Sequence, residues 1–334
     1  MKLLSLLLGL SILIIMLVGC NPTQNISQSI NITALPSATV SAPPPTTVQT
    51  TPTAAPVASL SSTPATVIRA PIEFDGARAF EHAAAQIAFG PRPVGSAAAR
   101  ETANYIFTQL RETGWQTEVQ EFEHLGLTVR NLIGRNALGQ GPVIILGAHY
   151  DTRFEADQDR SAPTTPVLGA NDGASGVSVL LELARSLDID RLQNEVWLAF
   201  FDAEDNGGLQ GWDWIVGSTY MASNLSIKPL VVIVVDMIGD ADQQIYFDHN
   251  SDSEWSTQIW ATAAGLGLQD HFIAEYKYAM LDDHTPFARE GILAVDIIDF
   301  DYPHWHTTGD TLDKLSAESL ERVGRTLEQL LENR

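Results

Sequence analysis

Four short runs of aliphatic and aromatic residues constrain the fold of this chain more strongly than any other feature. Each run is six or seven residues long and almost free of polar side chains: Val143–Ala148, Val196–Phe201, Leu230–Val235 and Ile292–Ile298. Runs of this kind are typical of strands that are covered on both faces, as in a mostly parallel sheet. The segments between them therefore have to supply the helices that cover the sheet.

Four further segments carry apolar residues at helical spacing. They cover residues 77–89, 97–114 and 175–187, and a last stretch from Leu320 to Leu331. An apolar stripe with this period marks a helix that packs one face against a core. Strands that alternate with such helices predict an α/β fold, with a mostly parallel central sheet flanked by helices. We expect one domain of this kind over residues 71–334.

The charge of the chain is concentrated in that region. The 334 residues include 19 basic and 41 acidic side chains, a net charge of −22. Residues 71–334 hold all the acidic and 17 of the basic residues, which gives this region a net charge of −24. So acidic a domain is poorly suited to binding the phosphates of nucleic acid or anionic lipid. We therefore expect no nucleic-acid partner.

The first 20 residues resemble an export signal. Lys2 is followed by an uncharged apolar run from Leu3 to Val18, shorter than the ~20 residues that span a bilayer. This pattern is typical of a secretory signal peptide. The sequence Leu17-Val18-Gly19-Cys20 resembles the lipobox of bacterial lipoproteins, which implies lipid attachment to Cys20 and anchoring to the extracytoplasmic face of a bacterial membrane. The alternative is an ordinary signal or anchor helix with an incidental cysteine.

Cys20 is also the only cysteine in the chain, which excludes an intramolecular disulfide and a thiolate zinc cluster. Residues 21–70 are rich in Ser, Thr, Pro and Ala and contain eight of the 17 prolines. A segment with this composition cannot bury enough apolar surface to offset the entropy lost on ordering. We predict a disordered tether between the anchor and the domain.

Acidic and imidazole side chains follow each of the predicted strands. His149 and Asp151 follow the first, Glu204 and Asp205 the second, and Asp236 the third; the fourth leads to His306. A further acid, Asp172, directly precedes a predicted helix. Taken alone, each has an ordinary explanation, such as a helix cap or a solvated loop. In open α/β sheets, however, the carboxyl ends of the strands form the binding edge.

Carboxylates that crowd together at such an edge need a cation to offset their repulsion. Imidazole and carboxylate ligands without thiolates suit a catalytic zinc site with an open position. The strand ends therefore indicate a zinc enzyme.

Several motifs between Gly147 and Leu331 resemble the co-catalytic zinc aminopeptidases and the animal-type glutaminyl-peptide cyclotransferases, which share one fold. The motifs are Asn171-Asp172-Gly173-Ala174-Ser175-Gly176, Phe200-Phe201-Asp202-Ala203-Glu204-Asp205, Asp236-Met237-Ile238-Gly239, Asp282-Asp283-His284 and Trp305-His306-Thr307. The resemblance implies a zinc aminopeptidase-like fold and an enzyme that acts on peptides or proteins with a free N-terminus.

The resemblance also implies roles for individual residues. Asp172, Asp205 and His306 would bind one zinc ion, and Glu204 would be the general acid or base. His149 and Asp236 match the remaining ligands of a two-zinc aminopeptidase, and Asp151 would orient His149. One departure is Asp205, which stands where many aminopeptidases have Glu; its shorter side chain requires a closer backbone.

The two branches of this superfamily catalyse different reactions. An aminopeptidase uses two zinc ions and hydrolyses the first peptide bond, with Glu204 as the base. A cyclase uses one zinc ion and closes an N-terminal Gln to pyroglutamate with release of ammonia, and Glu204 transfers the proton. In a cyclase, Asp236 and Asp282 would join Glu204 as catalytic carboxylates.

Asp282 and Trp305 match the cyclase pattern, and Trp212 and Trp214 lie where cyclases place a pocket tryptophan. We expect Trp212 and Trp305 to line the substrate pocket, although packing in the core is the commoner fate of Trp. The two-zinc ligand set of an aminopeptidase is complete, but His149 and Asp236 also occur in the single-zinc cyclases, so their presence does not decide between the two reactions. We favour the cyclase narrowly, with the aminopeptidase as the alternative and a non-catalytic peptide-binding lipoprotein as a remote third hypothesis.

Overall fold

The computed structural model describes residues 72–333. The predicted signal peptide, the lipidation site at Cys20 and the tether lie outside the described residues. Within the described part of the chain, no helix is both long enough and apolar enough to pass through a bilayer.

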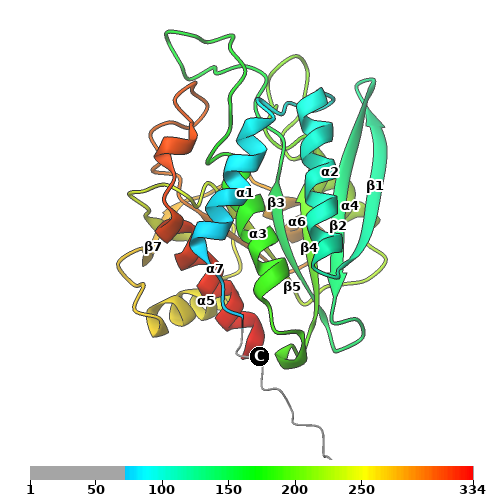
Figure 1. The fold of residues 1–334 in the computed structure, drawn as a ribbon, viewed down its shortest axis with the longest axis vertical. Coiled ribbons are helices and arrows are strands. Elements are labelled where there is room, and N and C mark those ends of the chain that lie inside the picture. Colours follow the sequence, from blue (N-terminus) through cyan, green and yellow to red (C-terminus); the bar gives the residue numbers. More distant parts are fainter. Residues whose placement is uncertain (1–71, 334) are drawn as a thin grey trace, which may run out of the picture. The chain divides into compact units, whose positions relative to one another are not determined.

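A six-stranded sheet forms the centre of the domain (Figure 1). Its strands, in spatial order, are β1 (Gln116–His124), β2 (Leu127–Asn136), β4 (Glu195–Phe201), β3 (Val143–His149), β5 (Val231–Asp236) and β8 (Ala294–Ile298). The pairs β4–β3, β3–β5 and β5–β8 are parallel, whereas β1–β2 and β2–β4 are antiparallel. The four predicted strands are therefore confirmed, and they are neighbours in the sheet.

Helices cover both faces of this sheet. Successive side chains of a strand point to opposite faces, so each buried strand contributes to two apolar cores. Ile144 and Leu146 of β3 pack in one apolar core, while Ile145 packs in another on the opposite face. The larger core involves α1 (Gly76–Ala88), α2 (Ala97–Glu112), α3 (Ala174–Ser186), α5 (Ser253–Gly265) and α7 (Ala317–Glu332). The smaller core involves α4 (Val216–Asn224) and α6 (His284–Arg289). The prediction of an α/β domain with a central sheet flanked by helices is confirmed.

Helices α4, α5 and α6 were not predicted, and neither were two parts of the β structure. The β1–β2 hairpin extends the sheet with antiparallel strands, and β1 is largely solvent-exposed. A second, two-stranded sheet pairs β6 (Ile245–Asp248) with β7 (Phe272–Tyr278), in parallel, with α5 between them in the chain. Two short 3-10 helices, Ile189–Arg191 and Leu312–Lys314, complete the secondary structure of the described residues.

Helix α3 lies very close to β5, and this contact positions the polar residues at the strand ends. Gly176 allows it, since a Cβ atom at this position would lie 2.2 Å from the carbonyl oxygen of Val235. The turn before the helix requires Gly173, whose φ is +100°. These two glycines hold the start of α3, and the adjacent Asp172, against the carboxyl end of β5.

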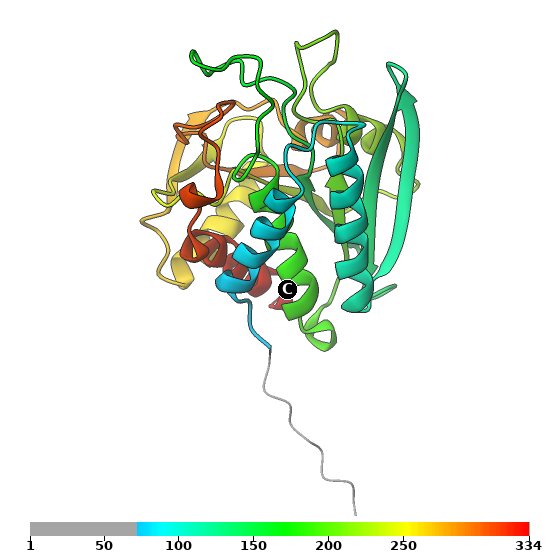
Figure 2. The ribbon, with the colours of Figure 1, turned by 45° about the horizontal axis from the view of Figure 1, so that its top comes forward.

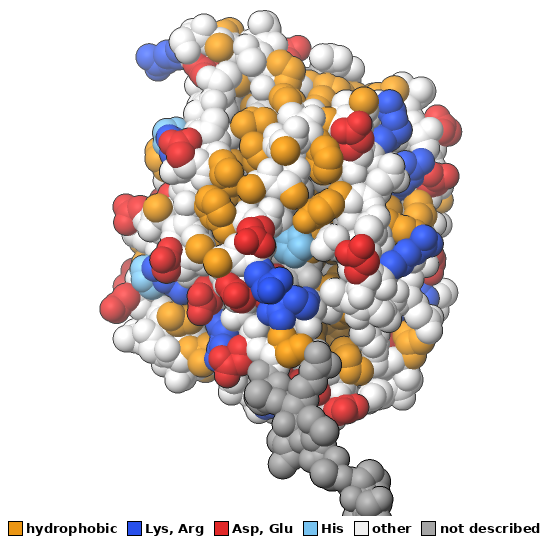
Figure 3. All heavy atoms as spheres, in the orientation of Figure 1, with side chains coloured by type: hydrophobic (Ala, Val, Ile, Leu, Met, Phe, Trp, Pro, Cys, Tyr) orange, Lys and Arg blue, Asp and Glu red, His pale blue; other side chains and the backbone are white. Residues whose placement is uncertain are grey.

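The loops that follow β3 and β4 rise from the same edge of the sheet, in green and yellow-green at the top of Figures 1 and 2. On the face shown in Figure 3, acidic side chains are scattered among basic ones rather than gathered into one patch. The acidic charge on this face is therefore spread out, as on a solubilising surface.

Candidate active site

The structure brings the predicted polar residues together at the carboxyl edge of the sheet. His149 ends β3, Asp236 ends β5, and Glu204 and Asp205 lie just beyond β4. His306 comes from the loop after β8, and Asp172 from the turn before α3. All six side chains are buried.

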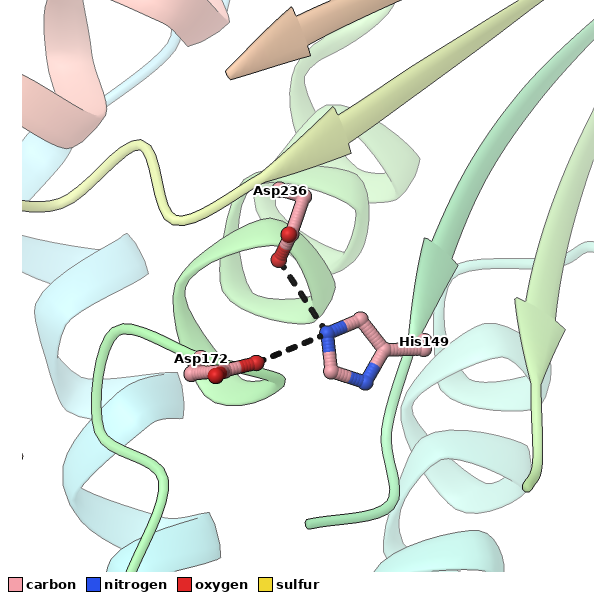
Figure 4. Close-up of side chains that lie close together, drawn as sticks. All are labelled: His149, Asp172 and Asp236. Carbon is pink, nitrogen blue, oxygen red and sulfur yellow. Dashed lines mark hydrogen bonds and ion pairs between the residues drawn. The ribbon is translucent and has the colours of Figure 1, made fainter. Parts of the chain in front are cut away.

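Two groups of side chains share Asp172 (Figure 4). In the first group, which Figure 4 shows, Nε2 of His149 lies 3.2 Å from Oδ1 of Asp172 and 3.1 Å from Oδ1 of Asp236. In the second, Nε2 of His306 lies 2.9 Å from Oδ1 of Asp205 and 3.7 Å from Oδ2 of Asp172. The two oxygens of Asp172 therefore face different imidazoles, as a carboxylate that bridges two cations would.

The donor atoms of both groups fit a divalent cation. Oδ2 of Asp172 and Oδ2 of Asp205 are buried without a hydrogen-bond partner. Burial and the neighbouring Asp172 raise the pKa of Asp205 to about 6, and burial raises that of Asp236 to about 7. These shifts reflect the cost of burying carboxylates side by side, which a cation would offset. Imidazole nitrogen and carboxylate oxygen are ligands that zinc accepts.

Glu204 belongs to neither group, although it adjoins Asp205 in the sequence. Its side chain lies on the wall of the pocket described below. Burial raises the pKa of Glu204 well above its usual 4.5; His149 opposes this shift, and Asp205 and Asp283 add to it. A carboxyl group with a raised pKa can accept and return a proton near neutral pH, as a general acid or base must.

Two buried aspartates hold the site residues in place. Asp151 accepts hydrogen bonds from the backbone nitrogens of Glu204 (2.9 Å) and Asp205 (3.3 Å), and its Oδ1 lies 3.6 Å from Nδ1 of His149. The structure thus places Asp151 behind His149, where the sequence predicted it. Asp310 accepts a hydrogen bond from the backbone nitrogen of Asp172 (3.1 Å). The prediction missed Asp310, although its position four residues after His306 could have indicated it.

A pocket of about 210 Å³ opens beside the two groups. Its apolar wall consists of Trp214, Met237, Met280, Leu281, Ile298, Phe300 and Trp305, and its polar wall of Asp172, Glu204, Asp205, Asp236, Asp282 and His306. Larger hollows of about 460 and 590 Å³ lie over α5 and α7, away from all of these groups. The pocket at the strand ends is therefore the candidate active site.

One predicted pocket residue lies elsewhere. Trp212 packs in a small apolar cluster with Val94 and Val129, and its ring contacts Phe154. Trp214 lines the pocket instead, and its ring is nearly parallel to that of His306, with centroids 5.9 Å apart. The difference arises because both tryptophans lie in an irregular loop, where a spacing of two residues does not determine which side chain points inward. Trp305 lines the pocket as predicted.

A third group of buried ionisable side chains includes Asp282 of the pocket wall. Asp282, His284 and Asp296 place donor atoms within 4.8 Å of one another. His284 lies between two carboxylates, with its Nε2 3.2 Å from Asp248 and its Nδ1 3.8 Å from Asp296. Burial and the neighbouring Asp282 raise the pKa of Asp296 well above its usual 3.8.

The backbone is strained at three points of this edge. Ala203, Met237 and His306 have φ values of 60°, 47° and 54°, in the left-handed region that favours glycine. Ala203 precedes Glu204, and Met237 follows Asp236. Residues other than glycine in this region are uncommon and cluster at functional sites.

The fold and the site together define an α/β enzyme with its polar centre at the carboxyl edge of a central sheet. The model of Peptidase family M28 matches residues 131–331, and the chain belongs to this family. The predicted superfamily is thereby confirmed. The match includes every candidate site residue of the domain.

The known relatives include enzymes of both predicted kinds. A glutaminyl-peptide cyclotransferase from Bos taurus is 26% identical over 224 residues, 55% of this chain and 60% of that protein's length. Two structures from Bacteroides thetaiotaomicron have a TM-score of 0.74. One, a leucine aminopeptidase precursor, is 31% identical and aligns over 78% of this chain and 98% of its own. The other, a glutaminyl cyclase bound to N-acetylhistamine, is 30% identical, with 78% and 99% covered. These similarities support both reactions equally.

Proposed function

We propose that this protein is a zinc enzyme that acts on peptide N-termini, and that its reaction is the cyclisation of N-terminal glutamine to pyroglutamate. The observation that carries the proposal is the pocket, which combines an aromatic wall with Glu204 and Asp282. Cyclisation consumes no water, so a small pocket walled by the rings of Trp214, Phe300 and Trp305 suits it better than hydrolysis. The acidic lining also favours the cationic amine of a peptide N-terminus.

The side chains present can carry out this reaction. Asp172, Asp205 and His306 would hold the zinc ion, which would supply Lewis acidity toward the side-chain amide of the substrate glutamine. The α-amine of the substrate, in its uncharged form, forms a bond with the amide carbon, the carbon–nitrogen bond of the amide breaks, and ammonia leaves. Glu204 takes the proton from the amine and gives it to the departing nitrogen. The apolar wall holds the glutamine side chain in the bent conformation that ring closure needs.

The aminopeptidase remains the second candidate because of one specific observation. The two groups that share Asp172 contain donors for two cations, which a two-metal hydrolase uses to stabilise the attacking and leaving atoms. In that reaction Glu204 would take a proton from the attacking water.

A pair of peptides that differ only in the first residue separates these functions. We expect the peptide with N-terminal Gln to release ammonia without becoming shorter, and the peptide with N-terminal Leu to remain intact. Ammonia is measured by a coupled assay and peptide length by mass spectrometry. Free leucine would contradict the cyclase and support the aminopeptidase, whereas no reaction with either peptide would favour the non-catalytic hypothesis.

We also propose that the protein is exported and anchored by a lipid on Cys20, so that its peptide substrates are extracytoplasmic. The lipobox-like sequence before Cys20 supports this proposal. In a bacterial host, the full chain should incorporate a labelled fatty acid and sediment with membranes. Cys20→Ser should remain unlabelled and leave the membrane fraction. Equal labelling of both chains would contradict the proposed anchor.

A further inference from the structure

Arg153 lies beside the second group and has no role in the proposed reaction. Its side chain is 4% exposed, which is unusual for arginine. Nε and Nη2 of the guanidinium donate to the two carboxylate oxygens of Asp157, at 2.7 and 2.9 Å. This bidentate geometry gives the strongest arginine–carboxylate contact. The hydrogen bonds from Arg153 lower the pKa of Asp157.

Both members of the pair also contact a predicted zinc ligand. Nη1 of Arg153 donates to the backbone oxygen of Asp205 at 2.7 Å and lies 3.9 Å from its Oδ1. Oδ1 of Asp157 lies 3.4 Å from Nδ1 of His306. In addition, the guanidinium lies over the ring of Trp214, 4.7 Å from its centroid. The pair therefore connects Asp205, His306 and the wall of the pocket.

The charges of Arg153 and Asp157 have opposite electrostatic effects on a cation bound by the second group. An unpaired guanidinium so close to Asp205 would repel a metal ion, and Asp157 neutralises that charge. The carboxylate of Asp157 also faces Nδ1 of His306 at 3.4 Å, which favours the tautomer that carries its proton on Nδ1 and leaves Nε2 free to face Asp205 and Asp172. A carboxylate in this position fixes the tautomer and orientation of an imidazole ligand.

We propose that Arg153 and Asp157 act as one clamp that sets the zinc affinity of the group formed by Asp172, Asp205 and His306. Both are positioning residues: Asp157 orients the ring of His306, and Arg153 holds Asp157 and the backbone of Asp205. The inference rests on the proposed zinc site, but not on which of the two reactions takes place there.

A double-mutant cycle tests the clamp through metal binding. The variants are Arg153→Met, Asp157→Asn and the combination, and zinc affinity is measured by competition with a chromophoric chelator. Loss of a residue that supports a metal ligand weakens binding about 10- to 100-fold, and we expect this of each single variant. The double variant should bind no more weakly than the worse single one, since either change releases the whole clamp.

A similar pair far from the site provides the matched control. Arg135 pairs with Glu118 on the β1–β2 hairpin and lies over the ring of Trp197, 3.9 Å from its centroid. Arg135→Met therefore removes the same kinds of contact, and it should leave the zinc affinity unchanged.

A spectroscopic measurement separates positioning from a general loss of structure. In the cobalt-substituted protein, Asp157→Asn should shift the visible absorption bands, which respond to the ligand geometry, while the far-ultraviolet circular dichroism stays the same. Arg153→Lys keeps the charge but loses the bidentate fork, so it should not restore the parent affinity. If Arg153→Met fails to fold, Arg153→Lys and Asp157→Asn test the clamp on their own.

The outcomes distinguish the clamp from the proposed function. If the parent protein binds no zinc, both are wrong. If it binds zinc and the single variants stay within about twofold of its affinity, the clamp alone is wrong. Losses that multiply in the double variant would also overturn it, because they would show two independent residues.

Discussion

Replacing Asp172 by Asn should remove bound zinc and reduce kcat/KM on the order of 10³-fold or more. The expected effect is large because both groups share this one carboxylate, with Oδ1 3.2 Å from His149 and Oδ2 3.7 Å from His306. Asn has nearly the same size but carries no charge, and its amide nitrogen cannot bind the cation. The backbone hydrogen bond from residue 172 to Asp310 does not depend on the side chain, so the fold should persist.

Zinc per protein chain, measured by atomic emission, and turnover of the reacting peptide check this prediction. Asp270→Asn is the matched control, because Asp270 is exposed in the turn before β7 and belongs neither to the groups of candidate ligands nor to the pocket wall. The control should retain the zinc content and activity of the parent protein. An Asp172→Asn protein that keeps its full complement of zinc would show that the site does not depend on a shared carboxylate.

Glu204→Gln, unlike Asp172→Asn, should retain its bound zinc, while its turnover falls by about 10²- to 10⁴-fold. Glu204 lies on the wall of the pocket but belongs to neither group of candidate ligands. The amide of Gln has nearly the same shape and cannot carry a proton between the substrate amine and the leaving nitrogen.

Asp205→Asn is the informative partner for this experiment, because the residue is adjacent in the sequence and differs in predicted role. We expect Asp205→Asn to lose both zinc and turnover, since Oδ1 of Asp205 lies 2.9 Å from Nε2 of His306. The reverse pattern, with zinc lost from Glu204→Gln and retained in Asp205→Asn, would mean that the two roles are assigned the wrong way round.

The sequence was sufficient to predict the buried strands and the edge of the sheet where the polar residues meet. Buried parallel strands require apolar residues on both faces, and this leaves a clear pattern in Val143–Ala148 and its three counterparts. The β1–β2 hairpin was missed because β1, at the edge of the sheet, is largely exposed and rich in Glu and Gln. Such a strand is stabilised by pairing with β2 rather than by a pattern of its own.

The sequence predicted the residues at the strand ends better than those that support them. Asp151 lies two residues from His149, so its position could be inferred along the strand. Asp310, Arg153 and Asp157 act through loops whose paths no periodicity describes, and Trp212 was chosen over Trp214 for the same reason. In each case tertiary contacts determine which side chain faces the site, and these contacts join segments far apart in the chain.

The left-handed conformations of Ala203, Met237 and His306 have a consequence for how the site works. Such conformations cost of order 1–3 kcal/mol each, and they persist only where the surrounding structure allows no alternative. The fold itself therefore imposes the directions of Glu204, Asp236 and His306. A preorganised site of this kind spends little of a ligand's binding energy on rearrangement, which leaves more of that energy for affinity and for the reaction.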